Sequence, residues 1–440
     1  MREELFQFIW QYRLYATTGD LFTSDGQFIQ IVHPGYPNKN AGPDFLEARI
    51  RIGPTLWAGH VELHLKSSDW KRHHHEEDPL YNKLILHVVF QHDESIETAD
   101  GSVFPTLELG PYLNQELMTR YEHLLNQTRF VPCAAHLNEI TDLQWANLKS
   151  RMLSERLEQK IQEVRMTRYR VKGNWQELFY LELASGFGLH VNKDIFRQLA
   201  ASIPLSLLSR CKQSLFRIEA LLFGQAGMLE NEFEEQYPRL LQQEYAFLRI
   251  KYNLKPLQQE HWKFLRMRPA NFPTVRIAQF AALIHQSSQL AGKILEAESL
   301  HQLESLFHAE LSPYWLTHYT FQEASAEKSK APGQAFIRSL ILNVLIPYVF
   351  VYGKDNAREA YCTKAMHWLN QLPAESNNIL NEWKKLGAPI EHAGDSQALL
   401  HLKTTYCNPK ACLRCSIGYQ IMKGNPSGKH ASEQQSGFTS

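Results

Sequence analysis

The sequence of 440 residues lacks an early apolar run of the length that a signal peptide or a membrane-spanning helix needs. Its opening, MREELFQFIWQYRLY, instead shows the apolar spacing of an amphipathic helix. Six cysteines are too few for a disulfide framework in a chain of this length, and no repeat of fixed period is present. These absences exclude a disulfide-stapled secreted domain and a repeat array. We expect a soluble, cytoplasmic protein.

Net charge is also missing, because 46 Lys and Arg balance 46 Asp and Glu. The balance is uneven along the chain: residues 1–135 hold 11 basic and 18 acidic side chains, a net charge of −7, and the remainder carries +7. An acidic N-terminal part suits metal cations better than phosphate groups. A nucleic-acid ligand would therefore take much of its attraction from the C-terminal part.

The length predicts more than one domain, because a single core stops growing at about 250–300 residues. Residues 1–135 show an α/β pattern: a helix, a three-strand meander, a short crossover and a strand. That last strand is the run LILHVVF, whose continuous apolar character is typical of a strand buried on both faces. We expect this unit to end near residue 135.

Residues 136–422 show helical periodicity with almost no strand-type alternation, which predicts an all-helical domain that ends in a cysteine cluster. The clearest helix covers residues 141–169, and the spacing predicts a single helix over 194–210. Residues 423–440 are polar and rich in Gly and Ser, so we expect a disordered tail.

The stretch from Asn40 to Lys66 gathers ionisable groups on two predicted strands. Strand side chains alternate between two faces, which predicts one face formed by Leu46, Ala48, Ile50 and Ile52 on the first strand. After a turn at Gly53-Pro54-Thr55, the opposite face of the returning strand presents His60, Glu62, His64 and Lys66. The hairpin predicts that Asp44 lies near Glu62.

This order of elements resembles the PD-(D/E)XK nuclease superfamily over about the first 110 residues. Pro43-Asp44 opens the second strand, and Glu62-Leu-His64 lies on the third. In that superfamily the Asp and the Glu hold a divalent metal, usually magnesium, which generates the nucleophile and neutralises charge on the scissile phosphate. The resemblance implies a restriction-endonuclease-like fold with Asp44 and Glu62 as magnesium ligands.

His64 stands where that superfamily has a lysine. A histidine is mostly uncharged near pH 7, so His64 can accept a proton from water or bind metal, and Lys66 on the same predicted face can supply positive charge. The resemblance implies a catalytic set of Asp44, Glu62, His64 and Lys66. Two other interpretations stay open: a remodelled fold without activity, and a strand with ordinary solvated side chains.

Seven of the twenty histidines fall within thirty-three residues of the N-terminal part. Imidazole and carboxylate are common zinc ligands, so this segment also predicts a zinc site that includes Glu62. The alternative is a polar crossover with surface histidines and a hydrogen-bonded core residue at His87. The seven are His60, His64, His73, His74, His75, His87 and His92.

Three cysteines near the C-terminal end, Cys407, Cys412 and Cys415, have the spacing C-x4-C-x2-C. Thiolates at this spacing can bind zinc or an iron–sulfur cluster, and reduced cysteines packed in a core are the alternative. A fourth ligand is missing locally, and the candidates are Cys133, Cys211, Cys362 and His401. Some PD-(D/E)XK nucleases hold an iron–sulfur cluster with one upstream cysteine and three C-terminal ones, and this resemblance implies Cys133.

A basic segment ends the predicted helix 141–169. It mixes cationic with aromatic side chains, as single-strand binders do, although a charged helix face is commonly just solvated. The candidate nucleic-acid contacts are Arg165, Arg168, Arg170 and Lys172.

Nearly the whole chain resembles an uncharacterised bacterial family of proteins with a domain of unknown function. The matching segments are NAGPDF, WAGHVELHLKSSDW, YNKLILHVV, LLFGQAGML, RPANFPTVRIAQFA and YCNPKACLRCSIG. The leading hypothesis is a magnesium-dependent nuclease-like protein that hydrolyses phosphodiester bonds in nucleic acid, with DNA as the expected partner and no membrane. The alternatives are a zinc hydrolase that uses the histidine-rich segment and a non-catalytic scaffold that binds nucleic acid or protein.

Overall fold

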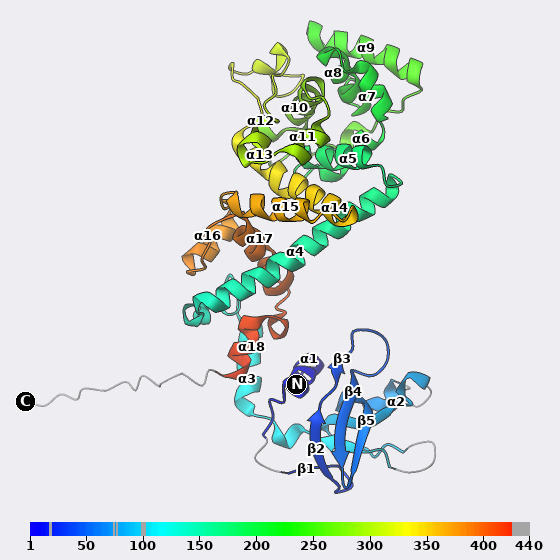
Figure 1. Cartoon of the computed structure of the whole chain (residues 1–440), viewed down its shortest axis with the longest axis vertical. Coiled ribbons are helices and arrows are strands. Elements are labelled where there is room, and N and C mark those ends of the chain that lie inside the picture. Colours follow the sequence, from blue (N-terminus) through cyan, green and yellow to red (C-terminus); the bar gives the residue numbers. More distant parts are fainter. Residues whose placement is uncertain (17–19, 74, 76–77, 98–102, 425–440) are drawn as a thin grey trace, which may run out of the picture. The chain divides into compact units, whose positions relative to one another are not determined.

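The structure is a computed structural model that describes residues 1–16, 20–73, 75, 78–97 and 103–424 (Figure 1). The chain forms two compact units, one of Met1–Trp145 with Leu402–Ser440 and one of Ala146–His401. The segment after residue 401, which holds the cysteines, therefore belongs to the N-terminal unit. The sequence pattern predicts it in the helical domain instead. Of the disordered tail predicted over residues 423–440, residues 425–440 lie outside the described residues, and Lys423 is the last residue of a helix.

The N-terminal unit is built on a seven-stranded mixed sheet. The path runs β1-β2-β4-β5-β6-β7, with β3 paired to β4; β2, β4 and β5 are antiparallel neighbours, and β5, β6 and β7 are parallel. The sequence predicts the central four strands and misses the short β1, β3 and β7. The strands are β1 Leu21–Phe22, β2 Phe28–His33, β3 Tyr36–Pro37, β4 Phe45–Ile52, β5 Thr55–Lys66, β6 Leu84–Gln91 and β7 Thr106–Glu108.

Beside shorter 3-10 and π-helical turns, the described part of this unit has three longer α-helices and one short one, α2. Helix α1 begins with Glu3 and Glu4, whose charges suit a helix N-terminus, and it buries Phe6 and Ile9. Phe6 meets Phe90 of β6 edge-on, with ring centroids 6.4 Å apart. The helices are α1 Glu3–Tyr12, α2 Asp69–Arg72, α3 Gln115–Asn126 and α18 Ser416–Lys423.

A β-bulge at Glu47 corrects the predicted alternation of β4. Glu47 has φ of 58°, and the pairing with β5 shifts between Phe45 and Ala48. One extra residue on a strand moves the side chains before it to the other face. Phe45, 1% exposed, therefore joins the buried row of Ala48 and Ile50, whereas Leu46, predicted in that row, is only half-buried.

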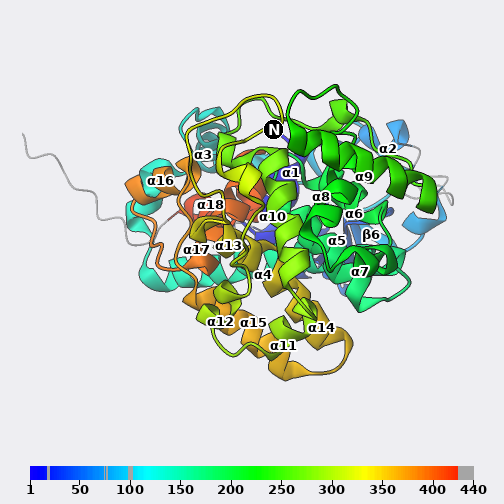
Figure 2. The ribbon, with the colours of Figure 1, turned by 90° about the horizontal axis from the view of Figure 1, so that it is seen from above.

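The second unit is helical, and α5, α8 and α10 pack together in both views (Figures 1 and 2). Its core includes Phe187, Phe223, Phe280 and Trp315, all buried. The α-helices outside the N-terminal unit are α4 Asp142–Arg170, α5 Trp175–Phe187, α6 Lys193–Ala201, α7 Leu205–Cys211, α8 Leu215–Gln225, α9 Gln236–Tyr252, α10 Pro273–Gln286, α11 Leu290–Glu296, α12 Leu300–Ser305, α13 Gln334–Leu340, α14 Ile346–Asp355, α15 Glu359–Gln371, α16 Asn378–Lys385 and α17 Ala393–His401.

Two prolines explain local departures from regular helix. The single helix predicted over 194–210 is wrong, because Pro204 precedes α7 and separates it from α6. Between α13 and α14 the residues Ile341–Leu345 form a π-helical turn just before Pro347, which has no N–H to donate to the preceding turn. Among the described residues, one helix is long and apolar enough to cross a membrane, the continuous helix Gln334–Asp355. In its most apolar 18-residue stretch, 67% of the residues are buried inside the protein.

Gly224→Ala is expected to destabilise the helical unit by about 1–3 kcal/mol, because an added Cβ would lie 2.0 Å from the ring of the buried Tyr245. The matched control is Gly292→Ala in α11, where nothing lies within 4 Å of an added Cβ, and there a slight gain in stability is expected. Urea unfolding followed by circular dichroism checks both, and equal unfolding midpoints for the two variants would contradict the close α8–α9 packing.

Candidate functional site

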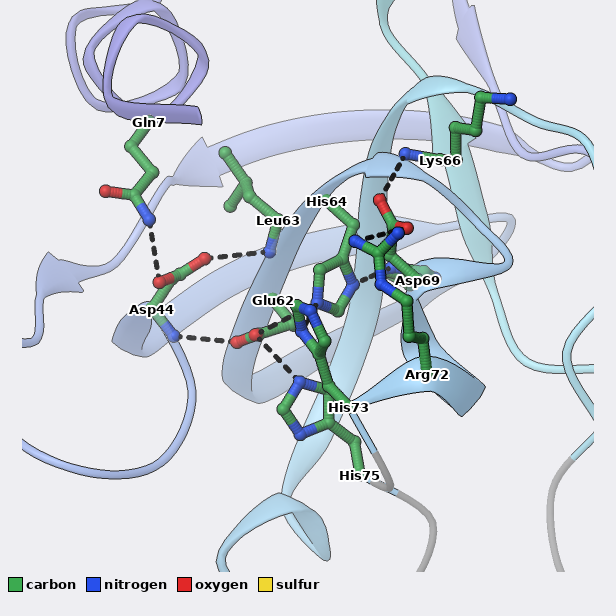
Figure 3. A network of polar contacts seen from close by, with 11 residues as sticks. Gln7, Asp44, Glu62, Leu63, His64, Lys66, Asp69, Arg72, His73 and His75 are labelled. Atoms are coloured by element: carbon green, nitrogen blue, oxygen red, sulfur yellow. Dashed lines mark hydrogen bonds and ion pairs between the residues drawn. The ribbon is translucent and has the colours of Figure 1, made fainter. Parts of the chain in front are cut away.

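Asp44 and Glu62 meet where β4 begins beside β5 (Figure 3). The Asp44 backbone N–H donates to Glu62 Oε2 at 2.9 Å, and Asp44 Oδ2 accepts the Leu63 backbone N–H at 3.1 Å. Gln7 of α1 donates from Nε2 to Asp44 Oδ1 at 2.8 Å. The predicted closeness of Asp44 to Glu62 is confirmed, and Gln7 is a member of the site that no sequence motif indicates.

Burial perturbs both carboxyl groups in the same direction. It raises the pKa of Asp44 to about 6 and that of Glu62 to about 8, and the charge of Asp44 adds to the rise at Glu62. Each carboxylate thus repels the other in a poorly solvated place. A cation between or beside them would relieve this repulsion, which is the electrostatic condition of a metal site.

Two imidazoles lie beside the other oxygen of Glu62, and a third contacts one of them. Glu62 Oε1 lies 3.4 Å from His75 Nε2 and 3.6 Å from His64 Nε2, and His64 Nε2 lies 3.2 Å from His73 Nδ1. A ligand atom from each of His64, His73 and His75 lies within 4.8 Å of the others. Glu62 is therefore shared: Oε2 is fixed by the Asp44 N–H, and Oε1 faces the histidines.

The three histidines are the group that can hold one metal ion. Metal–nitrogen bonds of about 2.0–2.1 Å at tetrahedral angles place neighbouring ligand atoms about 3.3 Å apart, close to the 3.2 Å between His64 Nε2 and His73 Nδ1. Nitrogen-rich sets of this kind suit zinc, iron or nickel, whereas magnesium and manganese prefer oxygen. The geometry thus offers a histidine-rich set beside the carboxylate pair predicted from the sequence.

His64 is held in the neutral state that metal binding needs. Burial is the main cause that lowers its pKa to about 3, with the charges of His75 and His73 adding to the effect, and burial also lowers that of His87 to about 3. His64 Nδ1 lies 2.9 Å from His87 Nε2. With Nε2 given to a metal, the Nδ1–H of His64 would donate to His87, the arrangement that orients ligating imidazoles.

The crossover after β5 carries His73 and His75 to this place because short polar side chains tie it to the end of β6. Asp93 accepts hydrogen bonds from Ser67 Oγ and from Ser68 N–H, both at 2.9 Å. Asp69 Oδ2 accepts the Lys66 N–H at 3.1 Å. Below the loop, Tyr81 stacks on His75 with ring centroids 4.1 Å apart. The predicted crossover therefore lines one side of the site with His73 and His75.

Other candidates from the sequence lie elsewhere. The Lys66 ammonium is 3.9 Å from Asp93, just after β6, and its side chain is 56% exposed, so its described ion pair is with Asp93 and not with Glu62. His60 Nδ1 accepts the Glu47 N–H at 3.3 Å, and His92 is half-buried. His74 lies outside the described residues.

The basic end of α4 is engaged within the helical unit. Arg165 and Arg168 both bind the carboxylate of Asp355, at 2.9 and 2.5 Å, and the Arg168 guanidinium lies 4.2 Å from the centre of the Trp175 ring. Arg170 and Lys172, which follow them in sequence, are both exposed. This arrangement matches the solvated, ion-paired helix face that was the alternative to nucleic-acid binding.

The four cysteines that the nuclease resemblance implies as ligands, Cys133, Cys407, Cys412 and Cys415, belong to the N-terminal unit. Cys133, Cys412 and Cys415 are buried, and Cys407 is half-buried. Burial raises the pKa of the Cys407 thiol, and the thiols of Cys133, Cys415 and Cys412 add to the rise. Cys211 and Cys362 belong to the other unit.

The N-terminal unit is thus a mixed sheet that carries a carboxylate–imidazole site on β5, in which Glu62 and His64 are buried and His73 is exposed. The chain belongs to the family described as "Protein of unknown function (DUF2851)", whose model matches residues 3–378. Comparisons with curated proteins and with solved structures find no significant match.

Glu62→Gln is expected to flatten the pH dependence of stability in the chelator-treated protein. A carboxyl with a raised native pKa contributes stability below its unfolded value of 4.5 and loses that stability as the pH rises toward about 8. Between about pH 5 and pH 9 the wild type should therefore lose stability relative to the variant, by an amount of the order of 1–3 kcal/mol.

Urea titrations across this pH range measure the effect. The control is Glu116→Gln on α3, whose carboxyl is 68% exposed and should leave the wild-type pH dependence unchanged. Parallel curves for wild type and Glu62→Gln would show that Glu62 is not held protonated by its surroundings.

Proposed function

We propose that this protein is a metal-dependent hydrolase of phosphodiester bonds in nucleic acid. The observation that carries the proposal is the meeting of Asp44, Glu62 and three imidazoles at one place on the sheet, held by the contacts of 2.8 to 3.6 Å given above. The sheet adds support, since an antiparallel meander followed by a parallel crossover is the order that the PD-(D/E)XK resemblance implies.

His64, His73 and His75 would hold one divalent ion, and Asp44 with Glu62 would offer oxygen ligands for magnesium. Such an ion lowers the pKa of bound water and offsets charge on the scissile phosphate. Hydrogen bonds within the protein orient these side chains. The Asp44 N–H orients Glu62, and Gln7 orients Asp44. His87 orients His64. The burial of Glu62 and His64, 6% and 2% exposed, keeps bulk water from their charges and ring nitrogens.

A zinc hydrolase with a different substrate is the second candidate, and the histidine set favours it. It differs from the first proposal in the bond that is cleaved and in a strict need for His73 and His75. A non-catalytic scaffold is the third interpretation, in which metal binding only stabilises the fold. We place the protein in the cytoplasm in each case.

The nucleic-acid strand would lie on the sheet face that carries Glu62, over β2, β4 and the first half of β5. His33 pairs with Arg49 and Arg49 with Ala58 across the strands, so these side chains share a face, and His60 and Glu62 follow Ala58 on it at alternate positions. A hollow of about 600 Å³ here is lined by residues that include Tyr36, Arg49 and His60, with Glu47 as its acidic member. Tyr36 is 60% exposed, which suits stacking with a base.

Metal-dependent cleavage is the first test of the proposal. Oligonucleotides labelled at one end are incubated with chelator-treated protein to which magnesium, manganese or zinc is returned. Asp44→Asn, Glu62→Gln and His64→Ala should each lower the rate by at least about 100-fold, because each removes a ligand or a group that orients one. Asp25→Asn, in the turn between β1 and β2, is the control and should cleave normally.

His73→Ala separates the metal assignments. Retained cleavage with magnesium and lost response to zinc would assign catalysis to Asp44 and Glu62. Loss with every metal would assign it to the histidine set. Absence of cleavage by the wild type with each metal and with both DNA and RNA would overturn the proposal, and tightly bound zinc in that inactive protein would favour the second candidate.

Arg49→Ala is expected to weaken binding of a short single-stranded DNA by up to about 10-fold and to reduce the magnitude of the salt slope by about one, because one phosphate contact is lost. The matched comparison is Lys172→Ala at the end of α4. Both changes are made in the Asp44→Asn protein, so that cleavage does not interfere, and fluorescence anisotropy at several salt concentrations reports affinity. A larger loss with Lys172→Ala would move the substrate surface to α4.

A further inference from the structure

A cavity of about 620 Å³ lies in the helical unit, between α5, α7, α10 and the start of α11. The residues that line it fall between Gln176 and Gly292, so the cavity belongs wholly to this unit. Sites for small organic ligands are typically cavities of roughly 300–1,000 Å³ with mostly apolar walls and a few polar groups. The size of this cavity therefore suits a small organic molecule.

The walls of the cavity are apolar side chains from three helices. Phe179 and Leu183 lie on α5, Leu208 lies on α7, and Phe280 and Leu283 lie on α10. Residues three or four apart share one face of a helix, so α5 and α10 each turn an apolar face toward the same space. The five side chains are at most 6% exposed. An apolar chain placed among them would be removed from water, which favours its binding.

Lys212, which follows α7, supplies charge at this cavity. It is the only residue with a charged side chain among the described residues that line the cavity. Its half-buried ammonium donates to the backbone carbonyl of Ser287, just after α10. His285 Nδ1 lies 2.8 Å from the Lys212 carbonyl oxygen, which ties the end of α7 to the end of α10. Because the described lining includes no carboxylate, the ammonium favours an anionic ligand.

Tyr180 of α5 contributes a hydroxyl without a partner. The residue lines the cavity and is 7% exposed, and its ring stacks on that of Phe280 with centroids 5.8 Å apart. Its buried hydroxyl has no hydrogen-bond partner among the described residues. Burial raises the pKa of Tyr180, so the hydroxyl keeps its proton and can donate. An unbonded buried hydroxyl lowers stability, and an acceptor atom on a ligand would remove that loss.

We propose that this cavity binds a fatty acid, with the acyl chain between α5, α7 and α10 and the carboxylate on Lys212. The Tyr180 hydroxyl would donate to an oxygen of the same ligand. The apolar walls favour the chain, and one ammonium matches a head group with one negative charge, because a second charge on the ligand would stay unpaired in a poorly solvated place. This inference is independent of the proposed hydrolysis.

Isothermal titration calorimetry of the full chain with decanoate tests the proposal. The protein is first freed of bound lipid on a hydrophobic resin, and the neutral analogue decanol is titrated in parallel. Wild type should bind one decanoate per chain, at least about 10-fold more tightly than decanol, because the ion pair with Lys212 adds to the same apolar contacts. Absence of decanoate binding, or equal affinities for decanoate and decanol, would overturn the proposal.

Lys212→Met assigns the head-group contact. It should lower the affinity for decanoate by about 10-fold and leave that for decanol unchanged, because only the charged ligand loses an ion pair. Lys212→Arg keeps the charge and should keep the preference for decanoate. The matched control is Lys293→Met at an exposed position of α11, which should bind decanoate as the wild type does. An equal loss of decanoate affinity in Lys293→Met and Lys212→Met would contradict the assignment.

Tyr180→Phe tests the unpartnered hydroxyl. It should raise the melting temperature of the ligand-free protein, because a buried polar group without a partner is removed, and it should weaken decanoate binding by about 3- to 10-fold. The melting temperature also shows that the variant is folded. A lowered melting temperature with unchanged decanoate binding would show that the hydroxyl is already bonded within the protein and would remove it from the site.

Discussion

The hydrogen bond from the Asp44 N–H to Glu62 is the contact on which the candidate site depends. A buried carboxylate is costly unless it is bonded or paired. Glu62 accepts one hydrogen bond from the Asp44 N–H at the start of β4, and its other oxygen faces the imidazoles of His64 and His75. The bulge at Glu47 makes this possible, because it re-aims the start of β4 while leaving Ile50 and Ile52 in the core. The positive φ of Glu47 in β4 is thus the local backbone strain that accompanies the hydrogen bond from Asp44 to Glu62 of β5.

The sheet explains why carboxylate and imidazole lie together without a dedicated binding loop. Period-two alternation brings Glu62 and His64 to one face of β5, and parallel pairing places His87 beside Glu62. The crossover then covers this face, so residues that an isolated hairpin would expose to water become 6% and 2% exposed. Both lowered imidazole pKa values and raised carboxyl pKa values follow from that one act of burial.

Much of the fold could be read from the sequence where periodicity is strong. The buried run of β6, the face of β5 with Glu62 and His64, and α4 follow from side-chain spacing. The bulge at Glu47 could not, because nothing in FLEARIRI distinguishes a regular strand from one with an extra residue. Gln7 could not either, since its contact with Asp44 depends on how α1 packs on the sheet, and the return of residues after 401 depends on long-range packing.

The route of the chain sets an order in which the protein can be completed. The N-terminal unit needs residues from Leu402 on, yet the ribosome makes Ala146–His401 first. At about 5–20 residues per second this delay is roughly 10–50 s, during which α1 lacks Tyr419, whose ring centroid lies 4.6 Å from that of Tyr12 in the complete fold. The helical unit, contiguous in sequence, can fold in that interval. The sheet unit is therefore begun first and finished last, which makes its assembly depend on complete synthesis of the chain.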